Sequence, residues 1–113
     1  MKIEFQSSKH ERLVNSIDDL RKKFNKTRGI DTALDIIESL NILSAAESLA
    51  DIPNCFRPHP LQGSYKGCFA IDVDKKNRII FKPNHPNDMN FRIDNYSSIK
   101  NIIVIELYKD YHK

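Results

Sequence analysis

The chain has 113 residues, of which 40% are hydrophobic, 29% charged and 9% aromatic. This composition argues against disorder, and we expect a single domain over residues 1–113 because the length does not support two cores. We predict a cytoplasmic protein without a membrane partner. No apolar run reaches the roughly 20 residues of a spanning helix, and residues 1–13 lack an apolar signal core. The net charge of +3 permits a polyanionic partner without requiring one.

The first quarter of the chain has the pattern of a short strand followed by a helix. Residues 2–6 alternate polar and apolar side chains, which predicts a strand. Ser8 followed by Glu11 forms a capping box, in which each side chain bonds a backbone N–H that the helix start leaves unpaired. Apolar residues then recur at helical spacing, so we predict a helix over about residues 9–25.

Two further helices are predicted from cap residues and helical spacing. Asp31 is a suitable N-cap for a helix that continues through Leu40. Ser44 and Glu47 form a second capping box, which predicts a short third helix. Pro53 ends this helix, because proline lacks the N–H that a helix interior needs.

Strand patterns occupy the second half. Residues 66–73 alternate, residues 74–77 form a polar turn, and residues 78–82 return as the second arm of a hairpin. Residues 84–98 are polar and predict a long loop. The β-branched run at 101–107 predicts a central strand covered on both faces. Helices before strands indicate an α+β fold, with helices on one face of a mainly antiparallel sheet.

Four motifs occur in order over about residues 56–112. They are His59-Pro60-Leu61-Gln62-Gly63, Lys66-Gly67-Cys68-Phe69-Ala70-Ile71, Asn77-Arg78-Ile79-Ile80-Phe81 and Tyr108-Lys109-Asp110-Tyr111-His112. In this order and spacing they resemble the HigB-type toxins of the RelE/ParE superfamily. The helical half of the chain resembles those proteins only in length and arrangement.

The resemblance implies a RelE/ParE-like fold, with N-terminal helices packed on a twisted, mainly antiparallel sheet. It also implies the toxin of a type II toxin–antitoxin system, which cleaves mRNA in the ribosomal A site without a metal or other cofactor. The implied partners are the ribosome, mRNA and a cognate HigA-like antitoxin, with which the chain would form a hetero-oligomer.

Metal-free RNA cleavage needs a base for the 2′-hydroxyl, cations beside the phosphate, and an acid for the leaving oxygen. The resemblance assigns phosphate binding to Arg78, whose guanidinium can grip phosphate oxygens in pairs. The alternative for Arg78 is a solvent-exposed hairpin residue. His59 matches the family's histidine in its motif, as a proton-transfer or phosphate-binding group. The alternative for His59 is a structural histidine bonded to the loop backbone.

The terminal motif supplies the remaining catalytic candidates. His112 is suited to proton transfer because an ordinary imidazole titrates near neutrality, and Tyr111 could stack on a base. The alternative is a frayed chain end. Adjacent strand residues point to opposite faces, so Tyr111 and His112 share a site only if the strand bends or ends there. Asp110 is expected to orient a neighbour.

The phosphate-binding candidates include two departures from the family pattern. Lys66 is expected to contact phosphate, although an exposed lysine at a turn is the alternative. Gln62 stands where relatives often have lysine, and Asp72 stands where a basic residue is common. Both departures lower the local positive charge. The hypothesis is that the active site is weaker, differently specific or lost while the fold persists.

The sequence is also compatible with two other functions. A ParE-like toxin of the same fold would poison DNA gyrase without nuclease residues, and a third possibility is a non-catalytic protein-binding domain. Arg78 and the terminal Tyr-His pair favour the nuclease, whereas Gln62 and Asp72 favour the alternatives. No metal site is expected, because the histidines and cysteines lack zinc-ligand spacing.

Overall fold

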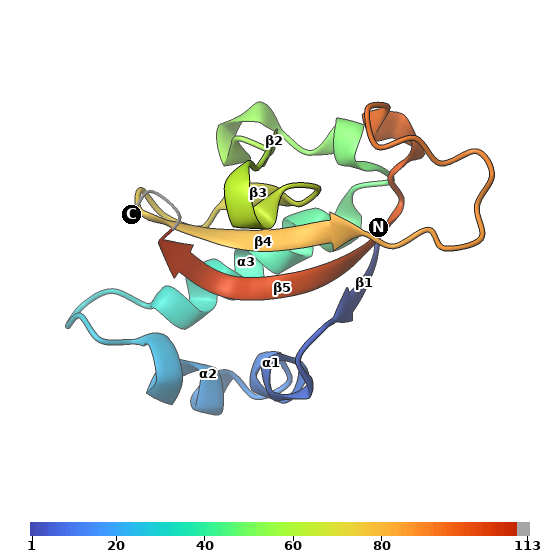
Figure 1. The fold of residues 1–113 in the computed structure, drawn as a ribbon. Helices are drawn as coiled ribbons and strands as arrows, with labels where there is room; N and C mark the ends of the chain where they lie inside the picture. Colours follow the sequence, from blue (N-terminus) through green and yellow to red (C-terminus); the bar gives the residue numbers. More distant parts are fainter. Residues whose placement is uncertain (111–113) are drawn as a thin grey trace.

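The computed structural model describes residues 1–110, in which helices precede most of the strands (Figure 1). The elements in chain order are β1 (Lys2–Phe5), α1 (Ser8–Val14), α2 (Ile17–Phe24), α3 (Thr32–Ala45), β2 (His59–Pro60), β3 (Phe69–Asp72), β4 (Asn77–Pro83) and β5 (Asn101–Asp110). Short 3-10 helices span Leu49–Asp51, Asn54–Phe56, Gly63–Tyr65 and Tyr96–Ser98. No helix within these residues is long and apolar enough to cross a membrane.

The strands form one sheet in the order β1-β5-β4-β3-β2. β1 runs parallel to β5, and the pairs β5/β4, β4/β3 and β3/β2 are antiparallel. Helix α3 lies behind the sheet, and α1 and α2 lie beside its β5 side (Figure 1). The predicted α+β class, with helices before a mainly antiparallel sheet, is confirmed.

The first predicted helix is divided into α1 and α2, so the prediction of one continuous helix over residues 9–25 was wrong. The side chain of Ser16 accepts a hydrogen bond from the backbone N–H of Asp19 and starts α2 afresh. The cap of α1 is Ser7, which accepts from the N–H of His10, and not Ser8. Each serine satisfies an N–H that a helix start leaves without a partner.

Helix α3 begins at the predicted cap, since Asp31 accepts from the N–H of Leu34. It continues to Ala45, so Ser44 lies inside the helix and the predicted capping box there was wrong. Leu43 is fully buried against the sheet, and this burial outweighs the local capping preference of Ser44. In place of the third α-helix, the chain forms the 3-10 helix Leu49–Asp51.

The hairpin and the long loop are confirmed, but the coverage of β5 was predicted wrongly. Ile102, Val104 and Leu107 are buried, whereas Ile103 and Ile105 between them are half-buried. One face of β5 therefore packs on the core and the other is partly open. Burial on both faces occurs instead in β4, in which four consecutive residues are buried, and in β3, in which three are.

The sheet has two faces with different surroundings. The main core lies between the sheet and α3 and includes Ile79 and Phe81 of β4. A smaller cluster on the other face contains Ala70 and Ile80. Because strand side chains alternate, Arg78 shares a face with Ile80. We call this face, opposite α3, the outer face.

Candidate active site

Arg78 is a buried member of an ion pair and not the exposed hairpin residue of the alternative interpretation. Its side chain is only 1% exposed, and its Nε lies 2.7 Å from Oδ1 of Asp72 on the neighbouring strand. Nη1 donates to the backbone carbonyls of Asp74 and Asn77, at 3.1 and 3.2 Å. These contacts fix the guanidinium at the end of β4, opposite Lys109 of β5.

A second arginine, which the sequence patterns did not indicate, approaches the same carboxylate. Nη1 of Arg57 lies 3.8 Å from Oδ2 of Asp72. Arg57 follows the 3-10 helix Asn54–Phe56 and adopts a left-handed conformation with φ of 51°. Asp72, which sequence reasoning treated as a repulsive charge near phosphate, therefore lies between two guanidinium groups on the outer face.

His59 also lies on the outer face, two strands away from Arg78. His59 pairs with Ala70, which pairs with Ile80, so Arg78 lies two strands across and two residues along from it. Strand spacing and rise place the two Cα atoms about 12 Å apart. Nδ1 of His59 is 2.6 Å from the carbonyl oxygen of Arg57. Because a carbonyl can only accept, Nδ1 carries a proton in this contact. The backbone bond and a chemical role are compatible, since Nε2 is the atom available for chemistry.

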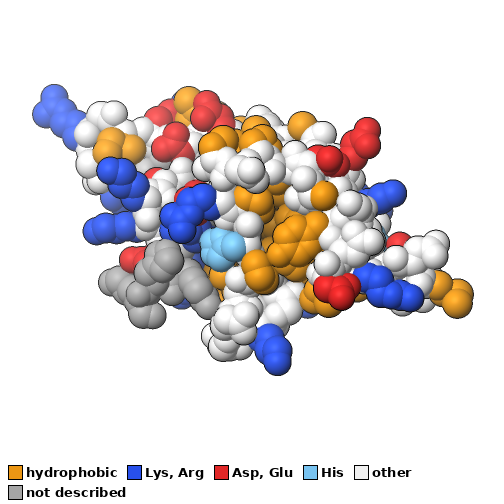
Figure 2. Space-filling model, turned by 90° about the horizontal axis from the view of Figure 1, so that it is seen from above, with side chains coloured by type: hydrophobic (Ala, Val, Ile, Leu, Met, Phe, Trp, Pro, Cys, Tyr) orange, Lys and Arg blue, Asp and Glu red, His pale blue; other side chains and the backbone are white. Residues whose placement is uncertain are grey.

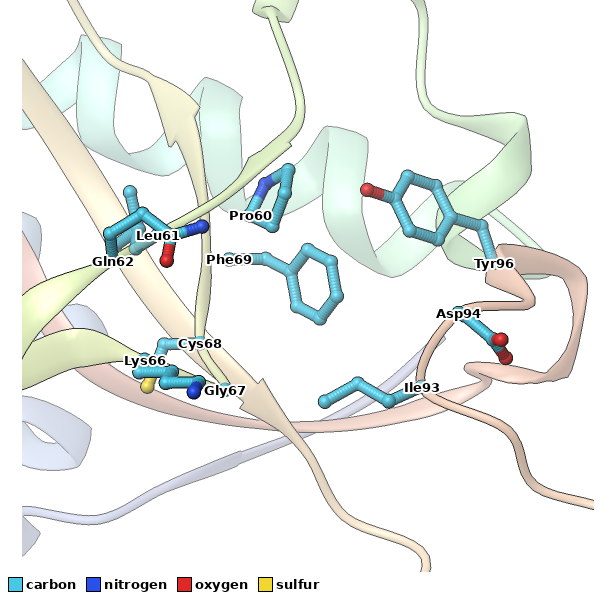
Figure 3. Close-up of a pocket in the computed structure, with 10 residues that line it drawn as sticks. All are labelled: Pro60, Leu61, Gln62, Lys66, Gly67, Cys68, Phe69, Ile93, Asp94 and Tyr96. Atoms are coloured by element: carbon cyan, nitrogen blue, oxygen red, sulfur yellow. The ribbon is translucent and has the colours of Figure 1, made fainter.

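Gln62 and Lys66 are exposed at the rim of a pocket of about 530 Å³. Its wall is formed by Pro60, Leu61, Gln62, Lys66, Gly67, Cys68, Phe69, Ile93, Asp94 and Tyr96. In Figure 3, Gln62 and Lys66 form one side of the pocket and the loop after β4 forms the other. The rings of Phe69 and Tyr96 meet edge to face, with centroids 5.3 Å apart. The pocket therefore has an apolar, aromatic wall against which a flat apolar group could pack.

An acidic group on the outer face was also missed by sequence reasoning. Glu106 is opposite Ile80 in the register and accepts a hydrogen bond from the hydroxyl of Tyr65 at 3.3 Å. Burial and the neighbouring Glu106 carboxylate raise the pKa of Tyr65. The pairing depends on a register shift in β5 next to Ile80, which local sequence patterns do not reveal.

The end of β5 is attached to the β3–β4 turn through Tyr108. Its hydroxyl hydrogen-bonds the carboxylate of Asp74, and its ring meets Phe24 of α2 edge to face at 5.7 Å between centroids. Burial and the bond to Asp74 raise the pKa of Tyr108 to about 12. The turn, the last strand and helix α2 are therefore joined beside Arg78.

The terminal candidates are only partly described. Asp110 is the last described residue and pairs with Asn77, the neighbour of Arg78. Tyr111 and His112, which the resemblance assigns to catalysis, lie outside the described residues. The described part of β5 thus ends next to Arg78.

The side-chain surface beside β2 combines basic and apolar groups. Figure 2 views this side from above and shows an apolar hollow at its centre. A histidine and neighbouring Lys and Arg side chains lie at one end of the hollow. Cationic groups beside an apolar hollow suit a nucleotide, which carries both a phosphate and a flat base. Within residues 1–110, no group of three or more His, Cys, Asp or Glu side chains could hold a metal ion.

The overall architecture is shared with a solved toxin structure. The chain matches no protein-family model and no curated protein. It does match a solved structure described as the YoeB/ParE toxin from Agrobacterium tumefaciens, with a TM-score of 0.51 and 12% sequence identity. The match covers 99% of this chain and 100% of the other. The expected RelE/ParE-like fold is confirmed, and nothing in the comparisons singles out the HigB branch.

Proposed function

We propose that the protein is the toxin of a type II toxin–antitoxin system and cleaves mRNA in the ribosomal A site. The proposal rests mainly on one observation: Arg78 and His59 lie on the same face of a sheet whose fold is shared with a YoeB/ParE toxin. The order of the four motifs, described above, supports the same activity. A HigA-like antitoxin would neutralise the protein in a hetero-oligomer, and the site of action would be cytoplasmic.

In the proposed reaction, Nε2 of His59 accepts the proton of a 2′-hydroxyl, and the freed oxygen attacks the adjacent phosphorus. Arg78 stabilises the charge that develops on the phosphate oxygens. The bond from phosphorus to the 5′-oxygen breaks, and His112, beside Tyr111, donates a proton to that oxygen. The products are a 2′,3′-cyclic phosphate and a 5′-hydroxyl end, so the reaction needs neither water nor a metal in the cleavage step.

A second candidate, poisoning of DNA gyrase, is favoured by the charge balance at Arg78. The carboxylate of Asp72 lies 2.7 Å from its Nε, and the exposed Gln62 contributes no positive charge. Both features reduce attraction for phosphate. A gyrase poison would arrest growth and damage DNA while leaving transcripts intact, which separates it from the nuclease.

The test is 5′-end mapping of transcripts after brief induction in a bacterium without the antitoxin. The wild-type chain should produce new cuts, in frame, within translated regions. His112→Ala should abolish these cuts because the proton donor is missing. The double variant Arg78→Ala/His112→Ala should also abolish them, because the phosphate-binding arginine is missing as well. Lys22→Ala, an exposed change on α2, is the matched control and should cut like the wild type. Growth arrest with intact transcripts would overturn the proposal and favour the gyrase alternative.

A further inference from the structure

Two arginines from different parts of the chain converge on one carboxylate of the outer face. Nε of Arg78 lies 2.7 Å from Oδ1 of Asp72, and Nη1 of Arg57 lies 3.8 Å from Oδ2. Each carboxylate oxygen therefore faces a different guanidinium. Two positive charges against one negative charge leave the cluster with an excess of one positive charge.

The position of Arg57 is maintained at a conformational cost. It is the only non-glycine residue with positive φ in the part of the chain that the structure describes. A side chain with a Cβ rarely adopts this conformation without a reason in the surroundings. Arg57 is 65% exposed, so burial does not supply that reason. The left-handed backbone closes the 3-10 helix Asn54–Phe56, where the N–H of Arg57 donates to the carbonyl oxygen of Asn54 at 2.9 Å. The exposed ion pair at 3.8 Å adds little stability, so the guanidinium of Arg57 can exchange Asp72 for another anion at little cost.

The backbone of Arg57 is also connected to the proposed base. Its carbonyl oxygen accepts the Nδ1 proton of His59 at 2.6 Å. The same left-handed turn thus directs the guanidinium of Arg57 toward Asp72 and fixes the ring of His59. Arg57 and His59 would therefore approach one phosphate together.

We propose that Arg57 and Arg78 form a two-arginine anion site for an RNA phosphodiester, and that Asp72 is the internal anion that the phosphodiester displaces. The choice of RNA rests on the proposed function. A phosphodiester presents two oxygens that share one negative charge, as a carboxylate does, and each can accept from one guanidinium. Arg57 then supplies the cation that Gln62 does not, and Asp72 excludes anions that are too weakly bound to replace it.

The test measures binding of a fluorescein-labelled 2′-O-methyl RNA hexamer by anisotropy across a series of KCl concentrations. This probe lacks the attacking hydroxyl, so binding is separated from cleavage. Arg57→Gly should weaken binding by about fivefold or more, because one charge-assisted contact is lost. It should also reduce the slope of log Kd against log salt by about 0.7, the contribution of one phosphate contact to a single strand. Glycine suits the left-handed backbone, so folding should persist.

Lys22→Ala is the matched control, since it also removes one positive charge. Lys22 is exposed on α2, which packs against α3. This variant should leave the salt slope unchanged. Asp72→Asn should bind the hexamer more tightly, by about fivefold, because the competing anion is gone. Circular dichroism checks its fold, since Arg78 is buried; if this variant does not fold, Arg57→Gly decides alone.

Equal effects of Arg57→Gly and Lys22→Ala would overturn the proposal, as would weaker binding by a folded Asp72→Asn variant. The outcome is independent of the transcript mapping. A selective loss in Arg57→Gly with uncut transcripts would support the anion site and reject the nuclease. Cut transcripts with no selective loss would support the nuclease and reject the role of Arg57.

Discussion

The guanidinium of Arg78 is buried, and a buried charge is unfavourable unless it is paired and hydrogen-bonded. Asp72 and two backbone carbonyls meet that requirement. An acidic residue at position 72 is therefore a structural partner of Arg78 and not only a departure from the family pattern. Its negative charge is in turn offset by Arg57, so the two unexpected residues are understood together.

The other departure, Gln62, leads to a gain-of-function prediction. Gln62→Lys should raise the rate of mRNA cleavage by about threefold or more, because an ammonium group at the pocket rim adds a contact to the phosphate in the transition state. The rate would be measured with ribosomes translating a defined mRNA. Ser64→Lys is the control, since Ser64 is exposed nearby but does not line the pocket. Unchanged or lower activity of Gln62→Lys, or an equal gain in the control, would contradict this account.

Among the elements, the sequence predicted which segments form helices and strands better than it predicted their ends. Asp31 was correctly identified as a cap because its helix starts where the apolar spacing starts. Ser16 was overlooked because the apolar spacing continues across it, although its side chain starts a new helix. Ser44 was misinterpreted because the burial of Leu43 against the sheet extends α3 past it, and this contact is not local in sequence.

The candidate site was predictable to the extent that it depends on alternation along strands. The positions of Asp72 and Arg78 in a hairpin follow from the polar turn between two alternating segments. The approach of Arg57 does not, because it depends on a left-handed residue in an irregular segment that no spacing rule marks. His59 was identified by its motif, and a bond to the loop backbone was the stated alternative, but the acceptor, the carbonyl of Arg57, was visible only in three dimensions.

The attachment of β5 to the β3–β4 turn gives a prediction about stability. Tyr108→Phe should lower the free energy of unfolding by about 1 kcal/mol at pH 7, because the hydrogen bond to Asp74 is lost while the ring contact with Phe24 remains. Urea unfolding measures the difference. If Tyr108→Phe and the wild type unfold at the same urea concentration, the hydroxyl does not have this role.

The same residue predicts the pH dependence. The pKa of Tyr108 is raised from 10.0 to about 12 in the folded chain, so the unfolded chain loses this proton first as the pH rises. The contribution of Tyr108 is therefore fully present below pH 10 and is lost between about pH 10 and 12. Over that range the urea midpoint of the wild type should fall toward that of Tyr108→Phe, and a constant difference would contradict the assignment.

In the whole molecule, the two faces of the sheet have different surroundings. The helices cover one face and form the main core, which leaves the outer face available for the proposed chemistry. The net charge of +3 is too small to hold RNA by charge alone. A ribosome that aligns the mRNA would therefore supply much of the orientation that cleavage requires, which agrees with ribosome dependence.

The most direct test of the central claim uses purified protein, an mRNA, and ribosomes stalled with a defined codon in the A site. Primer extension would locate any cut. We predict cleavage at the A-site codon with the wild-type protein and with Lys22→Ala, and no cleavage without ribosomes. His59→Gln, which lacks the base, should lower the cleavage rate by roughly a hundredfold or more. Intact mRNA on wild-type-treated ribosomes, or undiminished cleavage by His59→Gln, would contradict the account.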